Sequence, residues 1–154
     1  CYSAKKDEGG GVLLDLSHEI DYVQWLCGQI NEMKSYQVRI SDLEIDSDDL
    51  TMLIGKTYRN ILVNISIDYI SKITYRKLFV ETFKYTYELD FISNKLIKKD
   101  KNGVEETYSF SNLERNYMFE KMHLDIFNKQ KNICTFEEAL EVMDTISTIQ
   151  EQNR

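Results

Sequence analysis

The stretch from Gly9 to Gly28 constrains the fold of this chain more than any other part of the sequence. Its three consecutive glycines, at positions 9 to 11, free the backbone of side-chain restriction, and an apolar run with helical spacing begins directly after them. Gly28 closes the run with a residue that can adopt the left-handed conformation common at the end of a helix. The sequence therefore predicts one helix from about Gly10 to Cys27.

The two faces of the predicted helix differ in the residues they carry. One face is apolar and indicates the side that packs in the core, formed by Val12, Leu16, Ile20, Val23 and Cys27. The other face places polar and aromatic side chains within reach of one another: Asp15, His18, Tyr22 and Trp25. A carboxylate one turn from an imidazole can orient it and raise its basicity, which suits a general acid or base. The same pair is also common on ordinary helix surfaces, so the spacing alone leaves both interpretations open.

The run Gly-Gly-Gly-Val-Leu-Leu-Asp-Leu-Ser-His-Glu-Ile-Asp-Tyr, residues 9 to 22, resembles the start of the C-terminal domain in the Gfo/Idh/MocA family. Its members are relatives of glucose–fructose oxidoreductase and inositol dehydrogenase, NAD(P)-dependent enzymes that act on sugars and cyclitols. The resemblance extends from about Tyr2 to the C-terminal helix and is specific only in this run. It implies an α+β fold with a large, mostly antiparallel open sheet and helices packed on one face. It also implies a homodimer or homotetramer formed through the open face of the sheet.

The resemblance further implies roles for individual residues. In the family, a histidine and an aspartate lie beside the reacting hydroxyl, so His18 is expected to accept the proton and Asp15 to be its partner. The segment before the glycines lines the family's substrate cleft, which makes Tyr2, Ser3 and Lys5 candidates for sugar contacts, with a frayed chain end as the alternative. Tyr22, on the same predicted face as His18, is a further candidate for substrate binding.

The spacing of this run departs from the family motif. The motif has four residue steps from Asp to His, whereas Asp15 and His18 are three apart. Alignment on the glycines matches Asp15 with the family's aspartate, and alignment on His18 and Asp21 places Leu14 there instead. Asp15 is preferred, because spacings of three and four both keep two side chains on one helix face.

Charge and hydropathy argue against several classes of partner. The net charge of −7 disfavours nucleic acid and anionic membranes, since either would favour a basic patch. No apolar run is long enough to span a bilayer, and the sequence shows no signal peptide. The three cysteines, Cys1, Cys27 and Cys134, form no metal-ligand cluster, and no metal site is predicted. The simplest compartment is therefore reducing, which indicates the cytoplasm.

The chain is expected to be one domain, residues 1–154, of a longer enzyme. Its length fits a single domain, and its first residue is Cys rather than Met. Family members carry a Rossmann-type nucleotide-binding domain before this point. No strand in this sequence is followed by Gly-x-Gly-x-x-Gly and a helix, so NAD or NADP is expected to bind mainly to that other domain, and no cofactor-binding residue is predicted here. Because the family's catalytic lysine also belongs to that domain, the isolated chain is expected to be inactive.

After Gly28 the hydrophobic period changes from that of a helix to that of strands. The pattern predicts strands at 33–45, 50–57, 61–69, 73–82, 85–92, 96–99 and 104–110, with Asn102-Gly103 as a turn signal. Such a series implies one large antiparallel sheet. Two helices follow, one from Asn112 to about Lys129 and one that opens at Thr135 with a capping box to Glu138. The buried side of the last helix is predicted at Phe136, Leu140, Met143 and Ile146 or Ser147.

These features predict the substrate-binding and oligomerisation domain of an NAD(P)-dependent oxidoreductase that acts on a sugar, sugar-nucleotide or cyclitol hydroxyl. The alternative is a non-catalytic α+β module that dimerises or binds a protein partner. A free-standing hydrolase or metal enzyme has little support, because the two histidines are far apart and no Gly-x-Ser-x-Gly occurs.

Overall fold

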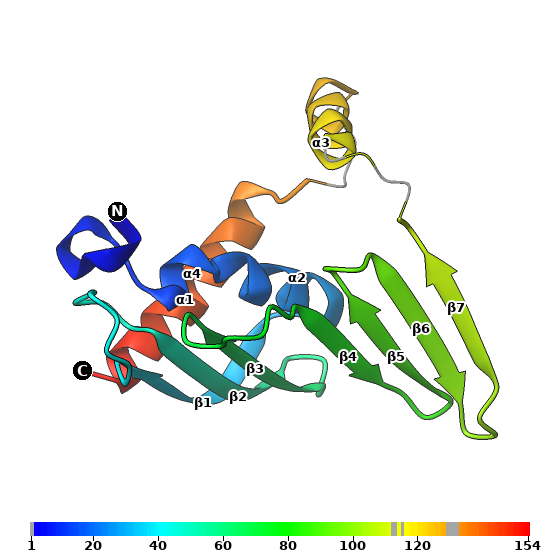
Figure 1. The fold of residues 1–154 in the computed structure, drawn as a ribbon, viewed down its shortest axis with the longest axis horizontal. Coiled ribbons are helices and arrows are strands. Elements are labelled where there is room, and N and C mark those ends of the chain that lie inside the picture. Colours follow the sequence, from blue (N-terminus) through cyan, green and yellow to red (C-terminus); the bar gives the residue numbers. More distant parts are fainter. Residues whose placement is uncertain (1, 112–113, 115, 129–132) are drawn as a thin grey trace. The chain divides into compact units, whose positions relative to one another are not determined.

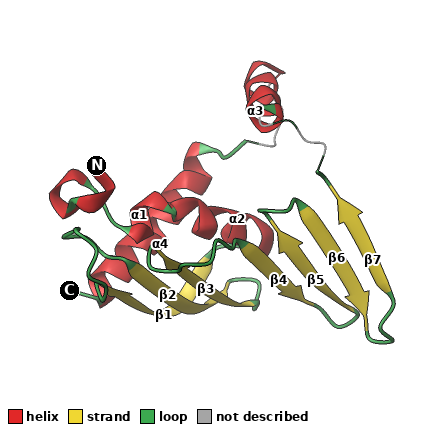
Figure 2. Cartoon of the chain, viewed as in Figure 1, coloured by secondary structure: helices red, strands yellow, loops and turns green. Residues whose placement is uncertain are grey.

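The computed structural model describes residues 2–111, 114, 116–128 and 133–154, which form two compact units. Unit 1 comprises residues 2–71 and 134–154, and unit 2 lies within residues 72–133. Each unit contains one antiparallel sheet, drawn in yellow in Figure 2. The α+β class with antiparallel sheets is thus confirmed, although the described strands pair in two sheets and not in one.

Unit 1 is a three-stranded sheet with helices on one face (Figure 1). The strand order is β1-β2-β3 with antiparallel pairing throughout. Helix α4 packs against β1 and α2, and α1 contacts β2 and β3. The elements are the 3₁₀ helices η1 (Tyr2–Ala4) and η2 (Lys6–Glu8), the helices α1 (Val12–Asp15), α2 (Ser17–Cys27) and α4 (Phe136–Gln152), and the strands β1 (Ile30–Val38), β2 (Leu50–Thr57) and β3 (Leu62–Asp68).

The core of unit 1 lies between the sheet and these helices. The predicted apolar stripe after the glycines is confirmed, because Val12, Ile20 and Val23 are buried while Leu16 and Cys27 pack against the core. Strands β2 and β3 alternate between buried and exposed residues, as expected where one face of a sheet is covered. The side chains that complete the core are Leu13, Ile30, Leu53, Val63, Ile65, Ile67, Val142, Ile146 and Ile149.

Helix α4 begins as predicted but buries a different stripe. Thr135 accepts a hydrogen bond from the N–H of Glu138, and the Glu138 carboxylate accepts one from the N–H of Thr135, so the capping box is confirmed. The predicted buried side is wrong except for Ile146, since Phe136, Leu140 and Met143 are exposed. The observed stripe includes Thr145, whose hydroxyl donates to Gln24 at 2.8 Å and thereby satisfies its polar group inside the core. The buried residues of α4 are Val142, Thr145, Ile146 and Ile149.

The predicted single helix from Gly10 to Cys27 is interrupted at Leu16. This residue has φ −106° and ψ 24°, and its carbonyl accepts the N–H of Glu19, only three residues ahead. The tight turn separates α1 from α2. Asp15 and His18 consequently stand on two helices with a turn between them.

Strand β1 runs from Ile30 to Val38, earlier than the predicted 33–45. The strand ends where the buried carboxylate of Asp49 takes over backbone donors, because its two oxygens accept the N–H groups of Ile40 and Ser41 at 2.9 and 2.8 Å. Asp49 also accepts the hydroxyl of Ser41 at 2.5 Å. Burial raises the pKa of the Asp49 carboxyl, but these hydrogen bonds outweigh it and hold the pKa below its ordinary value.

Unit 2 is a four-stranded sheet of order β4-β5-β6-β7 with one described helix, α3. The predicted strand at 73–82 begins only at Lys77, and both predicted ends of the helix from Asn112 to Lys129 lie outside the described residues. Cross-strand ion pairs join Lys77 with Glu88 at 2.6 Å and Lys98 with Glu106 at 3.0 Å. The elements are β4 (Lys77–Glu81), β5 (Tyr85–Asp90), β6 (Lys95–Asp100), β7 (Glu105–Ser109) and α3 (Tyr117–Asn128).

None of the described helices combines the length and the apolar character needed to cross a bilayer.

Candidate functional site

The glycines before α1 admit a carboxylate to the N-terminus of that helix. Asp48 accepts the N–H of Leu13 at 2.9 Å through its side chain and the N–H of Val12 at 3.0 Å through its backbone carbonyl. Gly11 has φ +123°, and a Cβ there would lie 2.1 Å from Asp48 Oδ1, so only glycine leaves room. Asp48 thereby satisfies two N–H groups at the N-terminus of α1.

Asp15, at the end of α1, is held by groups from two other segments. The hydroxyl of Tyr69, which follows β3, donates to Asp15 Oδ2 at 2.6 Å. Hydrogen bonding from Tyr69 first, and then from Ser3 and Tyr2, lowers the pKa of the Asp15 carboxyl, although burial opposes it. Burial, followed by the hydrogen bond to Asp15, raises the pKa of Tyr69 well above its ordinary value. Asp15 is thus a fixed anion whose oxygens already accept donors, and we call these four residues the Asp15 cluster.

His18, in the first turn of α2, lies against the carboxylate of its neighbour in sequence. Its Nε2 is 3.2 Å from Glu19 Oε1, and half of the imidazole surface is exposed while only 11% of the Glu19 side chain is. The second oxygen of Glu19 accepts the hydroxyl of Tyr22 at 2.5 Å. A phenol, a buried carboxylate and an accessible imidazole are thereby connected in series, and we call His18, Glu19 and Tyr22 the His18 triad.

The predicted site residues divide between these two groups. Tyr2 belongs to the Asp15 cluster and Tyr22 to the His18 triad, whereas Lys5 pairs with Glu8 at 2.6 Å on the surface. Among the contacts of the described residues, none joins Asp15 to His18. The tight turn at Leu16 accounts for this, because it interrupts the continuous helix on which the predicted spacing depends.

Two members of these groups were missed from the sequence, Tyr69 and Glu19. Tyr69 is 54 residues from Asp15 and is one of ten tyrosines, so no local pattern marks it. Glu19 is adjacent to His18, and adjacent residues on a helix do not ordinarily face each other. The three-residue spacing of Glu19 and Tyr22 was the available signal, because it places them on one helix face.

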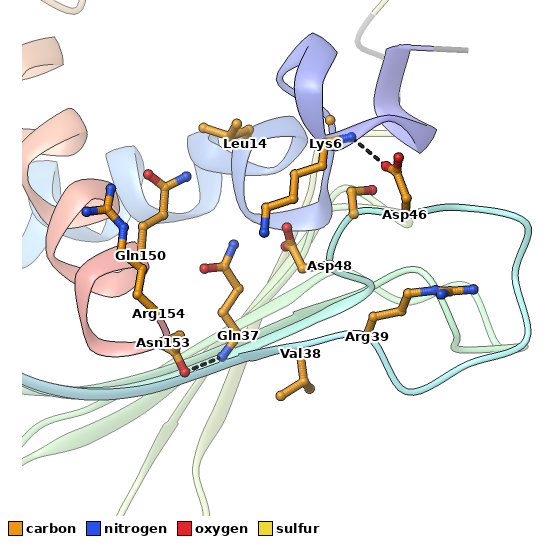
Figure 3. A pocket seen from close by; sticks show the side chains of 12 residues that line it. Lys6, Leu14, Gln37, Val38, Arg39, Asp46, Asp48, Gln150, Asn153 and Arg154 are labelled. Carbon is orange, nitrogen blue, oxygen red and sulfur yellow. Dashed lines mark hydrogen bonds between the residues drawn. The ribbon is translucent and has the colours of Figure 1, made fainter.

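A polar cavity of about 380 Å³ lies in unit 1 near the start of α1. Figure 3 shows that the side chains of Lys6, Gln37 and Asp48 point toward one another, whereas that of Arg39 points away. The backbone N–H of Lys6 donates to Asp46 at 2.6 Å at its margin. None of the residues predicted as catalytic or substrate-binding lines it. Within the part of the chain that is described, no group of three or more His, Cys, Asp or Glu side chains is placed to hold a metal ion.

Comparison with known proteins finds likeness in structure only. No model of a known protein family matches the sequence, and no curated protein matches it either. Among solved structures, a super-repressor mutant of Gal80p from Saccharomyces cerevisiae superposes with a TM-score of 0.83 at 14% identity, covering 99% of this chain and 50% of that one.

Two dehydrogenases show the same likeness. UDP-N-acetylglucosamine 3-dehydrogenase GnnA from Acidithiobacillus ferrooxidans gives a TM-score of 0.78 at 13% identity, covering 92% of this chain and 46% of that one. The WlbA dehydrogenase from Bordetella pertussis, solved with NADH and UDP-GlcNAcA, gives 0.69 at 14% identity, covering 97% and 44%. The chain thus spans about half the length of these proteins. The fold implied by the resemblance to the Gfo/Idh/MocA oxidoreductases is thereby confirmed.

Proposed function

We propose that this chain is the C-terminal substrate-binding and oligomerisation domain of a longer NAD(P)-dependent oxidoreductase. The reacting group would be a hydroxyl of a sugar, a cyclitol or a sugar nucleotide. Of these we favour the sugar nucleotide. The observation that carries the proposal is the geometry of His18, an accessible imidazole at the start of α2 held by a buried carboxylate. The fold supports it, since GnnA and WlbA are dehydrogenases and the WlbA structure contains a UDP-sugar derivative.

In the proposed reaction, His18 is the catalytic base that accepts the hydroxyl proton of the substrate. Asp15, kept anionic by its cluster, lies at the end of α1 before the turn at Leu16 and would contribute a fixed negative charge near His18. Tyr2, Lys5 and Tyr22 remain candidates for contacts to the sugar. NAD or NADP, which would take the hydride, is proposed to bind mainly to an N-terminal Rossmann domain outside this chain. The enzyme would work in the reducing cytoplasm, where the free thiols of Cys27 and Cys134 persist.

Turnover of the complete enzyme tests the proposal. Purified enzyme is incubated with NAD⁺ or NADP⁺ and a panel of UDP-sugars, among them UDP-N-acetylglucosamine, and formation of reduced cofactor is followed. His18→Ala should lower kcat by about 10²–10⁴, the usual contribution of general acid–base catalysis. Cofactor affinity should be unchanged, because the proposal places the cofactor on another domain.

His123→Ala is the matched control, because His123 is the second of the two histidines and lies exposed on α3. This variant should turn over like the wild type. If His18 is structural, His18→Ala will instead lower the melting temperature while turnover per folded molecule stays intact. That result would remove His18 from the mechanism.

We also propose that unit 1 assembles into a homodimer or homotetramer through the open face of its sheet. On the face of β1–β3 opposite the core, four large apolar side chains are solvent-exposed: Tyr36, Met52, Ile54 and Leu62. Ile54→Asp should shift the mass in light scattering toward the monomer, whereas Ile92→Asp, in a turn of unit 2, should not. A wild-type protein that is monomeric at high micromolar concentration would contradict this assembly.

The second candidate is a non-catalytic module that binds a protein partner or dimerises. It is favoured by one specific observation, the likeness to Gal80p, which is a repressor by its description. A complete protein that reduces neither cofactor with any UDP-sugar, yet assembles through the sheet face, would support this alternative.

A further inference from the structure

We propose that Glu19 is the positioning residue for His18, and that it takes the role expected of Asp15. This inference rests on the proposed function of His18 as the base. Asp15 accepts the hydroxyl of Tyr69 at 2.6 Å and is bound by Ser3 and Tyr2 as well, so its hydrogen bonds tie it to those segments. The turn at Leu16 then separates Asp15 from α2, and Glu19 is the carboxylate that contacts the imidazole.

The burial and contacts of Glu19 suit a residue that holds another in place. Its side chain is 11% exposed, and each of its two oxygens has a partner on α2. Oε1 lies 3.2 Å from His18 Nε2, and Oε2 accepts the hydroxyl of Tyr22 at 2.5 Å. Because Tyr22 fixes one oxygen, the carboxylate cannot rotate freely away from the imidazole. Side chains held in this way set the orientation and the tautomer of a histidine.

The contact indicates which nitrogen would do the chemistry: Nε2 lies against Glu19, so we assign Nδ1 as the proton acceptor. In the neutral imidazole that accepts a proton there, Nδ1 carries the lone pair and Nε2 the hydrogen. When the substrate hydroxyl reacts, its O–H bond breaks, the proton goes to Nδ1, and the electron pair of that bond stays on the oxygen. The resulting imidazolium then lies against the Glu19 carboxylate, 3.2 Å from Nε2 to Oε1. Half of the imidazole remains exposed, so a hydroxyl can approach it.

A double-mutant cycle on the complete enzyme tests whether Glu19 acts through His18. Glu19→Gln keeps the shape of the side chain and removes its charge. With the UDP-sugar that gives the highest turnover, this variant should lower kcat by about 10-fold or more and leave KM and the melting temperature unchanged. In a His18→Ala background, Glu19→Gln should cause no further loss, because the base that it positions is gone. Glu151→Gln, an exposed charge removal at the end of α4, is the control and should match the wild type.

The imidazole itself gives a second readout that needs no substrate. With only two histidines in this chain, the ¹⁵N signals of His18 can be assigned by comparison with a His123→Asn variant. Glu19→Gln should move both nitrogen signals of His18 and leave those of His123 in place. Tyr22→Phe, which removes the hydroxyl that holds Glu19, should move the His18 signals in the same direction by a smaller amount.

The outcomes separate this inference from the proposed function. If His18→Ala lowers kcat but Glu19→Gln does not, His18 remains the base and the role of Glu19 is wrong. Equal losses from Glu19→Gln in both backgrounds, or unmoved His18 signals, would also overturn it. If His18→Ala leaves kcat intact, or if no UDP-sugar is oxidised, the proposed function fails and the role of Glu19 fails with it.

Discussion

The two units of this chain differ in how many of their side chains are buried. Every buried apolar side chain of the described residues belongs to unit 1, where three helices and a three-stranded sheet enclose them. In unit 2 the only described residue that is buried is Asp125, on α3. The sheet of unit 2 nevertheless has one strand more than that of unit 1, and its strands are regularly paired. The strands of unit 2 are thus regularly paired although none of their described apolar side chains is fully buried.

This difference in burial predicts which unit contributes more to the free energy of unfolding. Burial of apolar surface is the dominant favourable contribution to folding, and unit 1 contains the described core. In unit 2 the strands are joined by backbone pairing and by cross-strand ion pairs such as Lys77 with Glu88, which contribute little to stability near the surface. Unit 1 should thus set the global stability, while unit 2 should open at lower cost.

The largest effect on the free energy of unfolding is expected from truncating a buried apolar side chain, and the two units can be compared by one such truncation in each. Ile146 is 1% exposed in the core of unit 1, and Ile146→Ala should lower the free energy of unfolding by about 2–5 kcal/mol. Leu89 lies half-buried on β5, so Leu89→Ala should cost less than half as much. Amide hydrogen exchange of β2 and β3 in increasing urea reports on unit 1. Amide hydrogen exchange of β5 and β6 reports on unit 2. Equal losses from both substitutions would refute the contrast.

Local sequence patterns predicted the elements of this fold better than their partners. The strand at 50–57 matches β2 in both bounds, and its residues alternate between the covered and the open face of the sheet, with Leu53 buried and Met52 and Ile54 exposed. The capping box at Thr135 is likewise a local device. Contacts between distant segments were not predictable in the same way. Asp49 ends β1 through its side chain, and Tyr69 binds Asp15 across 54 residues.

The candidate site shows the same limit on a smaller scale. His18 and Asp15 were found because a motif marks them, and the resemblance gave them roles. Their relation depends on the backbone at Leu16, whose tight turn no side-chain pattern indicates. Glu19 was missed because spacing rules assume a regular helix and assign adjacent residues to different faces.

The two units also differ in the free space around their glycines. A Cβ at Gly10 of unit 1 would lie 2.4, 2.6 and 2.7 Å from the backbone oxygens of Tyr2, Ser3 and Lys5. Gly10→Asn should therefore cost about 1–3 kcal/mol, the usual range for forcing extra atoms into a packed site. Gly103 of unit 2 has φ +83° and nothing within 4 Å of a Cβ, and asparagine tolerates this conformation. Gly103→Asn should cost less than Gly10→Asn, at most about 1 kcal/mol, because only the positive φ and no neighbouring atom opposes it. A thermal melt of both variants decides the matter, and a cost at Gly103 equal to that at Gly10 would contradict open packing in unit 2.

The smallest effect on stability is expected from replacing a carboxylate that accepts backbone N–H groups, and each unit contains one to compare. Asp49 in unit 1 is fully buried and binds Ile40 and Ser41, whereas Asp90 in unit 2 is half-buried and binds Ile92 and Ser93. Hydrogen bonds hold the pKa of both carboxyls below the ordinary value: at Asp49 they outweigh the opposing effect of burial, and at Asp90 the N–H of Ser93 contributes most.

A lowered pKa in the folded state means that the folded protein binds fewer protons than the unfolded chain. The resulting stability is present above the ordinary carboxyl pKa of about 4 and is lost as the pH falls through the folded-state value. Asp49→Asn should therefore lower the stability by about 1 kcal/mol at neutral pH, since an amide can accept only some of these donors. It should also reduce the loss of stability on acidification. Asp90→Asn should change both quantities less, because water can replace the carboxylate as acceptor at a half-buried turn. Urea midpoints of the three proteins between neutral pH and pH about 3 test this, and a steeper acid loss in Asp49→Asn than in the wild type would show that the sign is wrong.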